Sequence, residues 1–272
     1  MHPVLFEIGW FSLYTYGFLL MISFLTGLYL SVYRAKKLGI DPNVIIDLAI
    51  VIMVSSLVGS RGLYVAFHFE EFRGNLLDIV NPFQSDGYIG IAGLTVLGGI
   101  LLSFLSSYIF LKRKRQPILR IFNIVAPAIA LGTGITRIGC FFHGCCFGTA
   151  CDNVFGTIFP PNSIAGAMFP QQPIHPAQLY AAFGGFAIFT ILLLMERYTF
   201  FKDKAFFLYL ILYGISRFTV DIFRYYEESM VISQIGELNV SLNQGISILM
   251  LVFGIVSIVY LWYTEKIVPF KK

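Results

Sequence analysis

The sequence predicts an all-α, polytopic membrane protein, a helical bundle with about seven transmembrane helices. Hydrophobic residues make up 57% of the 272-residue chain and charged residues only 12%, whereas a soluble domain carries about 25% charged residues. Apolar runs long enough to cross a bilayer alternate with short charged clusters. The chain is therefore expected to form a single integral-membrane domain over residues 1–272.

Charged clusters bound the apolar runs and so define the predicted spans. In chain order the spans are 12–33, 44–68, 87–111, 118–142, 176–195, 205–224 and 243–263. The first is not expected to be a cleavable signal peptide, because residues 1–12 lack Lys and Arg and the apolar run is too long. Glycines at the start of the third span favour either close helix packing or a cavity lining. Residues 143–175 form a predicted external loop, which its prolines make irregular.

Lysine and arginine set the predicted orientation, because cytoplasmic loops are enriched in both. Four basic clusters fall on one side of the membrane under this span assignment: Arg34/Lys36/Lys37, Lys112–Arg115, Arg197/Lys202/Lys204 and Lys266/Lys271/Lys272. The N-terminus is therefore expected outside and the C-terminus in the cytoplasm. These clusters also explain the net charge of +4, so they indicate contact with membrane lipid and not with nucleic acid.

Arginines inside the predicted spans point to a functional site, because an unsatisfied arginine at mid-bilayer costs about 2.5–3.5 kcal/mol. The arginines within or at the outer ends of the spans are Arg61, Arg137, Arg217 and Arg224. In the sixth span, one helical face carries Tyr213, Arg217, Asp221 and Arg224. Arg217 and Asp221 can form an internal ion pair. The surplus of cations instead favours an anionic ligand, a phospholipid headgroup held by guanidinium groups.

All four cysteines lie in residues 136–151, where the fourth span ends, together with Arg137 and His143. Three interpretations of this stretch stay open. A disulfide could join Cys151 to Cys146 or to Cys140, and the cysteines with His143 are ligand types that bind zinc. In a catalytic interpretation, His143 acts as a base, or a thiolate of Cys140 or Cys145 is stabilised by Arg137.

Residues 136–148 share the arginine, the spacing and the glycines of a motif found in the bacterial prolipoprotein diacylglyceryl transferases, and the chain resembles that family. Further segments match in the same order along the chain: Tyr16-Gly17, Gly59–Tyr64 around Arg61, His175–Tyr180, Tyr213–Arg217 with Asp221 and Arg224, and Gln244. The resemblance covers most of the chain, and the ordered set of motifs is more specific than any one of them.

The resemblance implies a multi-pass enzyme of the bacterial cytoplasmic (inner) membrane. It implies transfer of the diacylglyceryl group of phosphatidylglycerol to the lipobox cysteine of an exported prolipoprotein, with glycerol phosphate released and no cofactor or metal. Arg137 and Arg217 would hold the lipid phosphate, and Asp221 would orient Arg217 or steer a proton. The other implied catalytic residues are His143, Cys140 and Cys145, and the implied substrate-binding residues are Tyr16, Arg61, Gln178, Tyr213, Arg224 and His175.

The chain also departs from the family pattern around the reaction centre. Leu97 stands where the family has a histidine, and Ala181 stands where glutamate is usual. Cys140, His143 and Cys145 replace asparagine, asparagine and glutamate. These changes leave open the general base, the state of the thiols and the acceptor, as well as the oligomeric state. The alternatives are the same donor with a different acceptor, or a non-enzymatic lipid-binding, metal-binding or redox membrane protein.

Overall fold

The computed structural model of the chain describes residues 4–8, 11–73, 79, 93–152, 154–198, 200–201, 203–226, 231–235 and 238–267. They belong to two compact units. Residues 1–31 and 122–272 contribute to the first unit, and residues 32–121 contribute to the second.

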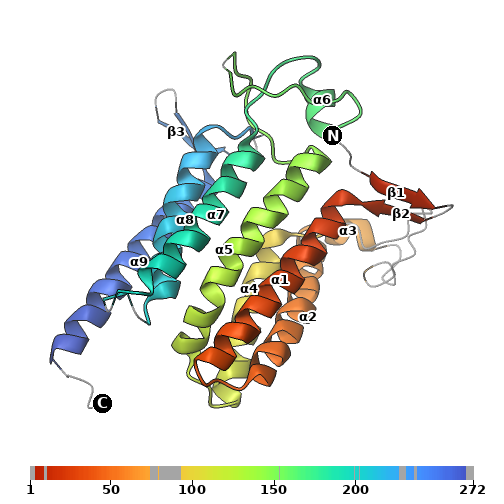
Figure 1. Cartoon of the computed structure of the whole chain (residues 1–272). Helices are drawn as coiled ribbons and strands as arrows, with labels where there is room; N and C mark the ends of the chain where they lie inside the picture. The colour runs from red at the N-terminus through yellow and green to blue at the C-terminus, as the bar shows by residue number, and fades with distance from the viewer. Residues whose placement is uncertain are drawn as a thin grey trace. The chain divides into compact units, whose positions relative to one another are not determined.

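Within the described residues, seven helices are long and apolar enough to cross a bilayer. They are α1 (Thr15–Lys37), α2 (Pro42–Phe67), α4 (Val96–Arg113), α5 (Ile118–His143), α7 (Ala177–Met195), α8 (Ala205–Ile222) and α9 (Leu242–Ile267), labelled in Figure 1. The predicted all-α, polytopic bundle is therefore confirmed, and the chain is a multi-pass membrane protein. The side of the membrane that each end faces stays a prediction.

Two of the helix ends that differ from the predicted spans bear on the site. The third span was expected from residue 87, but α4 begins at Val96. Gly93 has a φ of 74°, a left-handed conformation that a helix does not contain, and residues 80–92 lie outside the described residues. The sixth span was expected to reach Arg224, but α8 ends at Ile222. Arg224 instead pairs with Gly148 in an isolated β-bridge, which takes it out of the helix.

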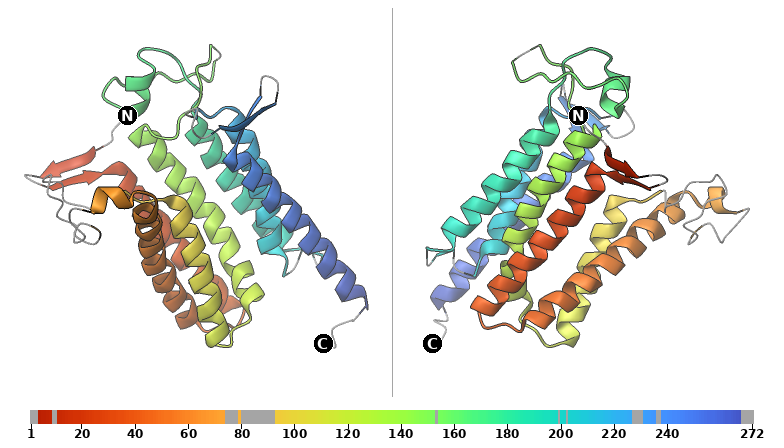
Figure 2. Two further views of the ribbon diagram at one scale, coloured as in Figure 1. Left: turned by 180° about the vertical axis from the view of Figure 1, so that it is seen from behind. Right: turned by 45° about the vertical axis from the view of Figure 1, so that its right-hand side comes forward.

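Glycines set the close packing of helices in the first unit. A Cβ atom added to Gly185 of α7 would lie 2.6 Å from the backbone nitrogen of Gly134 in α5. One added to Gly214 of α8 would lie 2.7 Å from the carbonyl oxygen of Ser247 in α9. Small residues allow this approach, which gains dispersion contacts in a bilayer. Helix α8 consequently packs against both α7 and α9, as the two views of Figure 2 show.

The second unit contains α2, α4 and the short helix α3 (Phe69–Phe72). Asp41 caps α2 by accepting a hydrogen bond from the Asn43 backbone at 3.0 Å. Helices α2 and α4 meet backbone to backbone, because a Cβ atom on Gly59 would overlap the carbonyl of Gly98 and the reverse also holds. Close packing is therefore the role of Gly98, one of the glycines of the predicted third span.

Short elements connect the helices at one end of the first unit, the upper end in Figure 1. They are the antiparallel strand pairs β1 (Val4–Ile8) with β2 (Phe11–Tyr14) and β3 (Val231–Ile235) with β4 (Leu238–Ser241), and the helix α6 (Ile164–Met168). The predicted loop 143–175 is irregular apart from α6 and isolated bridges to Ile174 and Arg224. Phe147, Phe159 and Ile174 bury their side chains together and hold the loop against itself.

Candidate active site

The polar face of α8 forms the first part of the site. Arg217 Nη2 lies 3.1 Å from Asp221 Oδ1, in an ion pair whose arginine side chain is 12% exposed and whose carboxylate is fully covered. The predicted pairing of these two residues is thus present. Burying a charge without a partner would be costly, so the pair allows both groups to stay ionised inside the bundle.

Residues beyond α8 complete the hydrogen bonding of this pair. Tyr226 donates to Asp221 Oδ1 at 2.7 Å and accepts from Arg217 at 2.9 Å and from Asn243 at 3.0 Å. Ser241 donates to Asp221 Oδ2 at 2.8 Å. Burial raises the pKa of Tyr226, which keeps its hydroxyl protonated and able to donate. We call Arg217, Asp221, Tyr226, Ser241 and Asn243 the Asp221 network.

Arg137 of α5 and Arg217 of α8 line one small cavity, together with Tyr213, Thr133 and Ser216. Its volume is about 20 Å³, room for about one water molecule. The cavity therefore marks where two guanidinium groups and several hydroxyl groups converge, and a larger anion would have to move these side chains apart. Two cations next to hydroxyl donors are suited to binding phosphate oxygens.

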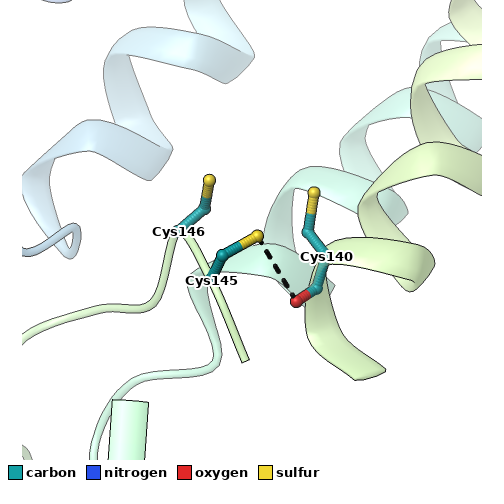
Figure 3. A group of neighbouring side chains, drawn as sticks. All are labelled: Cys140, Cys145 and Cys146. Carbon is teal, nitrogen blue, oxygen red and sulfur yellow. Dashed lines mark hydrogen bonds between the residues drawn. The ribbon is translucent and has the colours of Figure 1, made fainter. Parts of the chain in front are cut away.

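The second part of the site is a group of three thiols at the end of α5. The sulfur atoms of Cys140, Cys145 and Cys146 all lie within 4.8 Å of one another, as Figure 3 shows. The Cys145 thiol also donates to the carbonyl of Cys140 at 3.8 Å. We call these three residues the thiol cluster. All four cysteines of the chain are free thiols, so neither of the disulfides considered from the sequence is present, and Cys151 lies outside the cluster.

The chain brings these thiols together by reversing direction after α5. Gly144 has a φ of 74° and Cys146 a φ of 60°, both in the left-handed region, which costs a non-glycine residue about 1–2 kcal/mol. Neighbouring side chains in an extended segment would point to opposite sides. The turn instead points Cys145 toward Cys140 and leaves the side chains of Cys146 and Cys140 pointing in the same direction.

Charge interactions connect the thiol cluster to the arginines. Hydrogen bonds from the thiols of Cys140 and Cys145, together with the guanidinium groups of Arg224 and Arg137, hold the pKa of the Cys146 thiol below its usual range. Within the described residues, no carboxylate lies within 4.0 Å of either guanidinium group. The thiol of Cys146 therefore interacts electrostatically with two arginines that have no carboxylate partner in the part of the chain that the structure describes.

Gln178 and His143 border the thiol cluster with incomplete hydrogen bonding. Gln178 is 1% exposed, and its Nε2 donates to the Cys145 carbonyl at 2.8 Å. Among the described residues, no partner reaches Gln178 Oε1, His143 Nδ1 or the Nε atom of Arg224, although all three atoms are buried. Buried polar atoms are normally paired, so each of these three atoms can bind a ligand or a water molecule.

Tyr16 joins this part of the site, whereas His175 lies in an aromatic group beside it. The Tyr16 and His143 rings are 5.9 Å apart, and the Tyr16 hydroxyl is close enough to the thiols and to Arg137 for electrostatic interaction. His175 Nδ1 lies 3.1 Å from the Tyr180 hydroxyl, and its ring packs 5.0 Å from that of Phe223. These partners give His175 a packing role at the start of α7.

Arg61 belongs to the second unit. It is 8% exposed and donates to the carbonyls of Ile79 at 2.9 Å and Gly93 at 3.2 Å. Its guanidinium also lies 4.9 Å from the centre of the Phe72 ring. These contacts hold the chain on both sides of residues 80–92, so Arg61 has a structural role whether or not it binds substrate.

Sequence reasoning missed three residues of the site: Tyr226, Ser241 and Asn243 were not considered. Cys146 was considered as a disulfide partner, a metal ligand or a redox thiol, but not as a member of the reaction centre. The three polar residues lie outside α8, so no helical periodicity connects them to Arg217 and Asp221.

Comparison with known proteins decides the family. The sequence model described as prolipoprotein diacylglyceryl transferase matches residues 3–260. The chain belongs to the prolipoprotein diacylglyceryl transferase family. The resemblance inferred from the ordered motifs is thereby confirmed.

Individual relatives agree with this membership. Three of them bear the name phosphatidylglycerol–prolipoprotein diacylglyceryl transferase. The protein of Clostridium tetani is 30% identical over 224 residues, 82% of this chain and 86% of its own. That of Clostridium botulinum is 30% identical over 221 residues, 81% and 86% of the two chains. That of Prochlorococcus marinus is 32% identical over 233 residues, which cover 80% of this chain and 77% of the relative.

Proposed function

We propose that this family member moves the diacylglyceryl group of phosphatidylglycerol to the cysteine thiol of an exported prolipoprotein, in the bacterial inner membrane. The single observation that carries the proposal is the convergence of Arg137 and Arg217 on one cavity between α5 and α8. The names of the relatives support the donor and the acceptor.

In this reaction the acceptor sulfur bonds to the terminal glyceryl carbon of the diacylglyceryl group while the bond from that carbon to the phosphate oxygen breaks. Glycerol phosphate leaves with the bonding electrons. Arg137 and Arg217 stabilise the negative charge that grows on the phosphate, and such pre-positioned donors are worth about 2.7–4 kcal/mol each in a site without bulk water. Asp221 is a positioning residue, because it holds Arg217 and leaves it a single orientation.

The acceptor thiol must lose its proton, and we assign that proton to His143. Its Nδ1 is buried and lacks a partner among the described residues, and it lies at the end of α5, about 1.7 helical turns after Arg137. Tyr16, Gln178, Tyr213, Arg224 and His175 are assigned to substrate binding around the same region. Arg61, which belongs to the second unit, stays a predicted substrate-binding residue. Cys140 and Cys145 stay predicted members of the reaction centre.

The N-terminus is proposed to lie outside the cell and the C-terminus in the cytoplasm, as the basic clusters predict. The strand pairs and α6 lie at the same end of the first unit as the start of α1. That arrangement supports a thiol cluster and a His143 that face the outside, where an exported acceptor would arrive.

The test is transfer by the purified full-length protein in detergent micelles, with labelled phosphatidylglycerol and a lipobox peptide. We expect lipid-modified peptide and glycerol phosphate in equal amounts. Arg137→Lys should lower turnover about 100-fold or more, because lysine does not reproduce the two parallel hydrogen bonds of a guanidinium. Arg113→Lys, at the far end of α4, is the matched control and should keep full activity.

Two results would contradict the proposal: absence of both products with the wild-type protein, or full turnover by Arg137→Lys. Glycerol phosphate released without modified peptide would instead indicate the same donor with a different acceptor. One observation favours this second candidate: near Arg137, the residues Cys140, His143 and Cys145 replace three polar residues of the family pattern.

A further inference from the structure

The thiol cluster has a geometry that the transfer of a lipid does not require. Its three sulfur atoms lie within 4.8 Å of one another, and it is the one such group of potential metal ligands among the described residues. We propose that Cys140, Cys145 and Cys146 bind a thiophilic metal ion with a filled d shell, Zn²⁺ or Cu⁺, through three thiolates.

The sulfur positions are close to those that a metal would impose. A metal–sulfur distance of about 2.3 Å places three sulfurs around one ion about 3.8–4.0 Å apart. Separations of up to 4.8 Å therefore need shifts of about 1 Å or less, within the reach of side-chain rotation. Thiolates select Cu⁺ and Zn²⁺ over harder ions such as Mg²⁺ or Ca²⁺. Three ligands suit Cu⁺ directly and leave Zn²⁺ a fourth position for water.

The backbone holds these ligands before any ion binds. Cys140 is anchored on the last turn of α5. The Cys145 backbone donates to the carbonyl of Cys140 at 3.2 Å, and Gln178 donates to the carbonyl of Cys145 at 2.8 Å. The left-handed φ of 60° at Cys146 fixes the third side chain on the same side of the turn. Little conformational entropy is then lost on binding, which raises the affinity for the ion.

The surrounding charge suits an anionic metal site. Each thiol that binds releases its proton to water, so three thiolates leave a formal charge of −1 with Zn²⁺ and −2 with Cu⁺. Arg137 interacts electrostatically with Cys140 and Cys146, and Arg224 interacts with Cys146. In the described part of the chain neither guanidinium has a carboxylate partner. The two cations can therefore offset the charge of either complex.

Cys151 provides an internal control. It follows Cys146 by five residues on the same loop and is buried, at 8% exposure, but its sulfur does not belong to the group of three. A metal site built by geometry should need the three clustered thiols and not the fourth. Nonspecific binding to cysteine-rich sequence would depend on all four equally.

The test uses the full-length protein in micelles, reduced and freed of metal, with four free thiols verified by titration. Zn²⁺ and Cu⁺ are added separately in competition with chromophoric chelators, and Cd²⁺ serves as a probe through its sulfur-to-metal charge-transfer absorption. We expect one ion per chain. Cys140→Ala, Cys145→Ala and Cys146→Ala should each weaken binding at least about 100-fold, since loss of an outer-shell partner alone costs about 10–100-fold. Cys151→Ala should bind like the wild type.

Circular dichroism checks that each variant is folded. If the buried Cys140→Ala is not, the comparison of Cys145→Ser and Cys146→Ser with Cys151→Ser decides, because Cys145 and Cys146 are only partly buried. The proposal is overturned if the reduced wild type binds no ion stoichiometrically, or if Cys151→Ala weakens binding as much as the clustered variants. The readout is metal binding, so the outcome does not depend on the proposed transferase activity.

Discussion

The Asp221 network and the thiol cluster lie in the same unit but differ in how completely their polar groups are paired. In the Asp221 network, both carboxylate oxygens accept hydrogen bonds and Tyr226 has three partners. Around the thiol cluster, His143, Gln178 and Arg224 each bury an atom that has no partner among the described residues. The first region is a fully hydrogen-bonded support that holds Arg217, whereas the second keeps unpaired donors and acceptors that can bind a ligand.

The largest expected effect comes from a substitution in the Asp221 network. Asp221→Ala removes both acceptors of the buried ion pair and leaves Arg217 charged and unpaired, which should lower the free energy of unfolding by about 3–5 kcal/mol. Chemical denaturation in micelles measures it. The matched control is Asp47→Ala, which removes an exposed ion pair with Lys114 at 3.8 Å and should cost at most about 1 kcal/mol. Equal losses in the two variants would show that the Asp221 network is not a rigid support.

A smaller change to the same region removes one hydroxyl group. Tyr226→Phe leaves a donor on Arg217 and another on Asn243 without their acceptor, which should cost about 1–3 kcal/mol. Tyr225→Phe is the control, because the structure describes ring packing of Tyr225 against Phe147 and no bond to its hydroxyl. The same denaturation experiment compares them. A Tyr226→Phe protein as stable as Tyr225→Phe would contradict the hydrogen-bond pattern.

The smallest expected effect concerns the incompletely paired region. Gln178→Ala removes the hydrogen bond to the Cys145 carbonyl, a loss of about 0.5–1.5 kcal/mol. It also frees the turn, so Cys145 should react with a thiol-alkylating reagent severalfold faster, while Cys151 should keep its rate. Mass spectrometry of the labelled peptides gives both rates in one sample. An unchanged rate at Cys145 would mean that Gln178 does not position this turn.

The sequence predicted the structure well where the determining residues lie in one segment, and poorly where they come from distant segments. The helices and the Arg217–Asp221 pair follow from patterns local to one segment, namely apolar length and a spacing of four residues. The start of α4 was misplaced because Gly93 adopts a left-handed φ that composition does not reveal. Tyr226 and Ser241 reach Asp221 from beyond α8, and such contacts depend on how β4 and α9 return, which no periodicity encodes.

The positions of the thiols could likewise be predicted only in part from the sequence. The sequence placed Cys140, Cys145 and Cys146 near one helix end but left disulfide, metal and catalytic interpretations open. Only the left-handed turn at Gly144 and Cys146 determines which sulfurs meet and separates Cys151 from them. The family could be inferred from the sequence alone, because the order of the motifs along the chain does not depend on the conformation of this turn.

Arg137 lines the cavity proposed for the lipid phosphate together with Arg217, and it also interacts electrostatically with Cys140 and Cys146 of the thiol cluster. One guanidinium cannot fully neutralise two anions at once. Binding of a metal at the thiols and of a phospholipid at the cavity would therefore be antagonistic, and each would weaken the other by the same factor. Such reciprocity would allow the supply of the metal to set how much lipid the site holds.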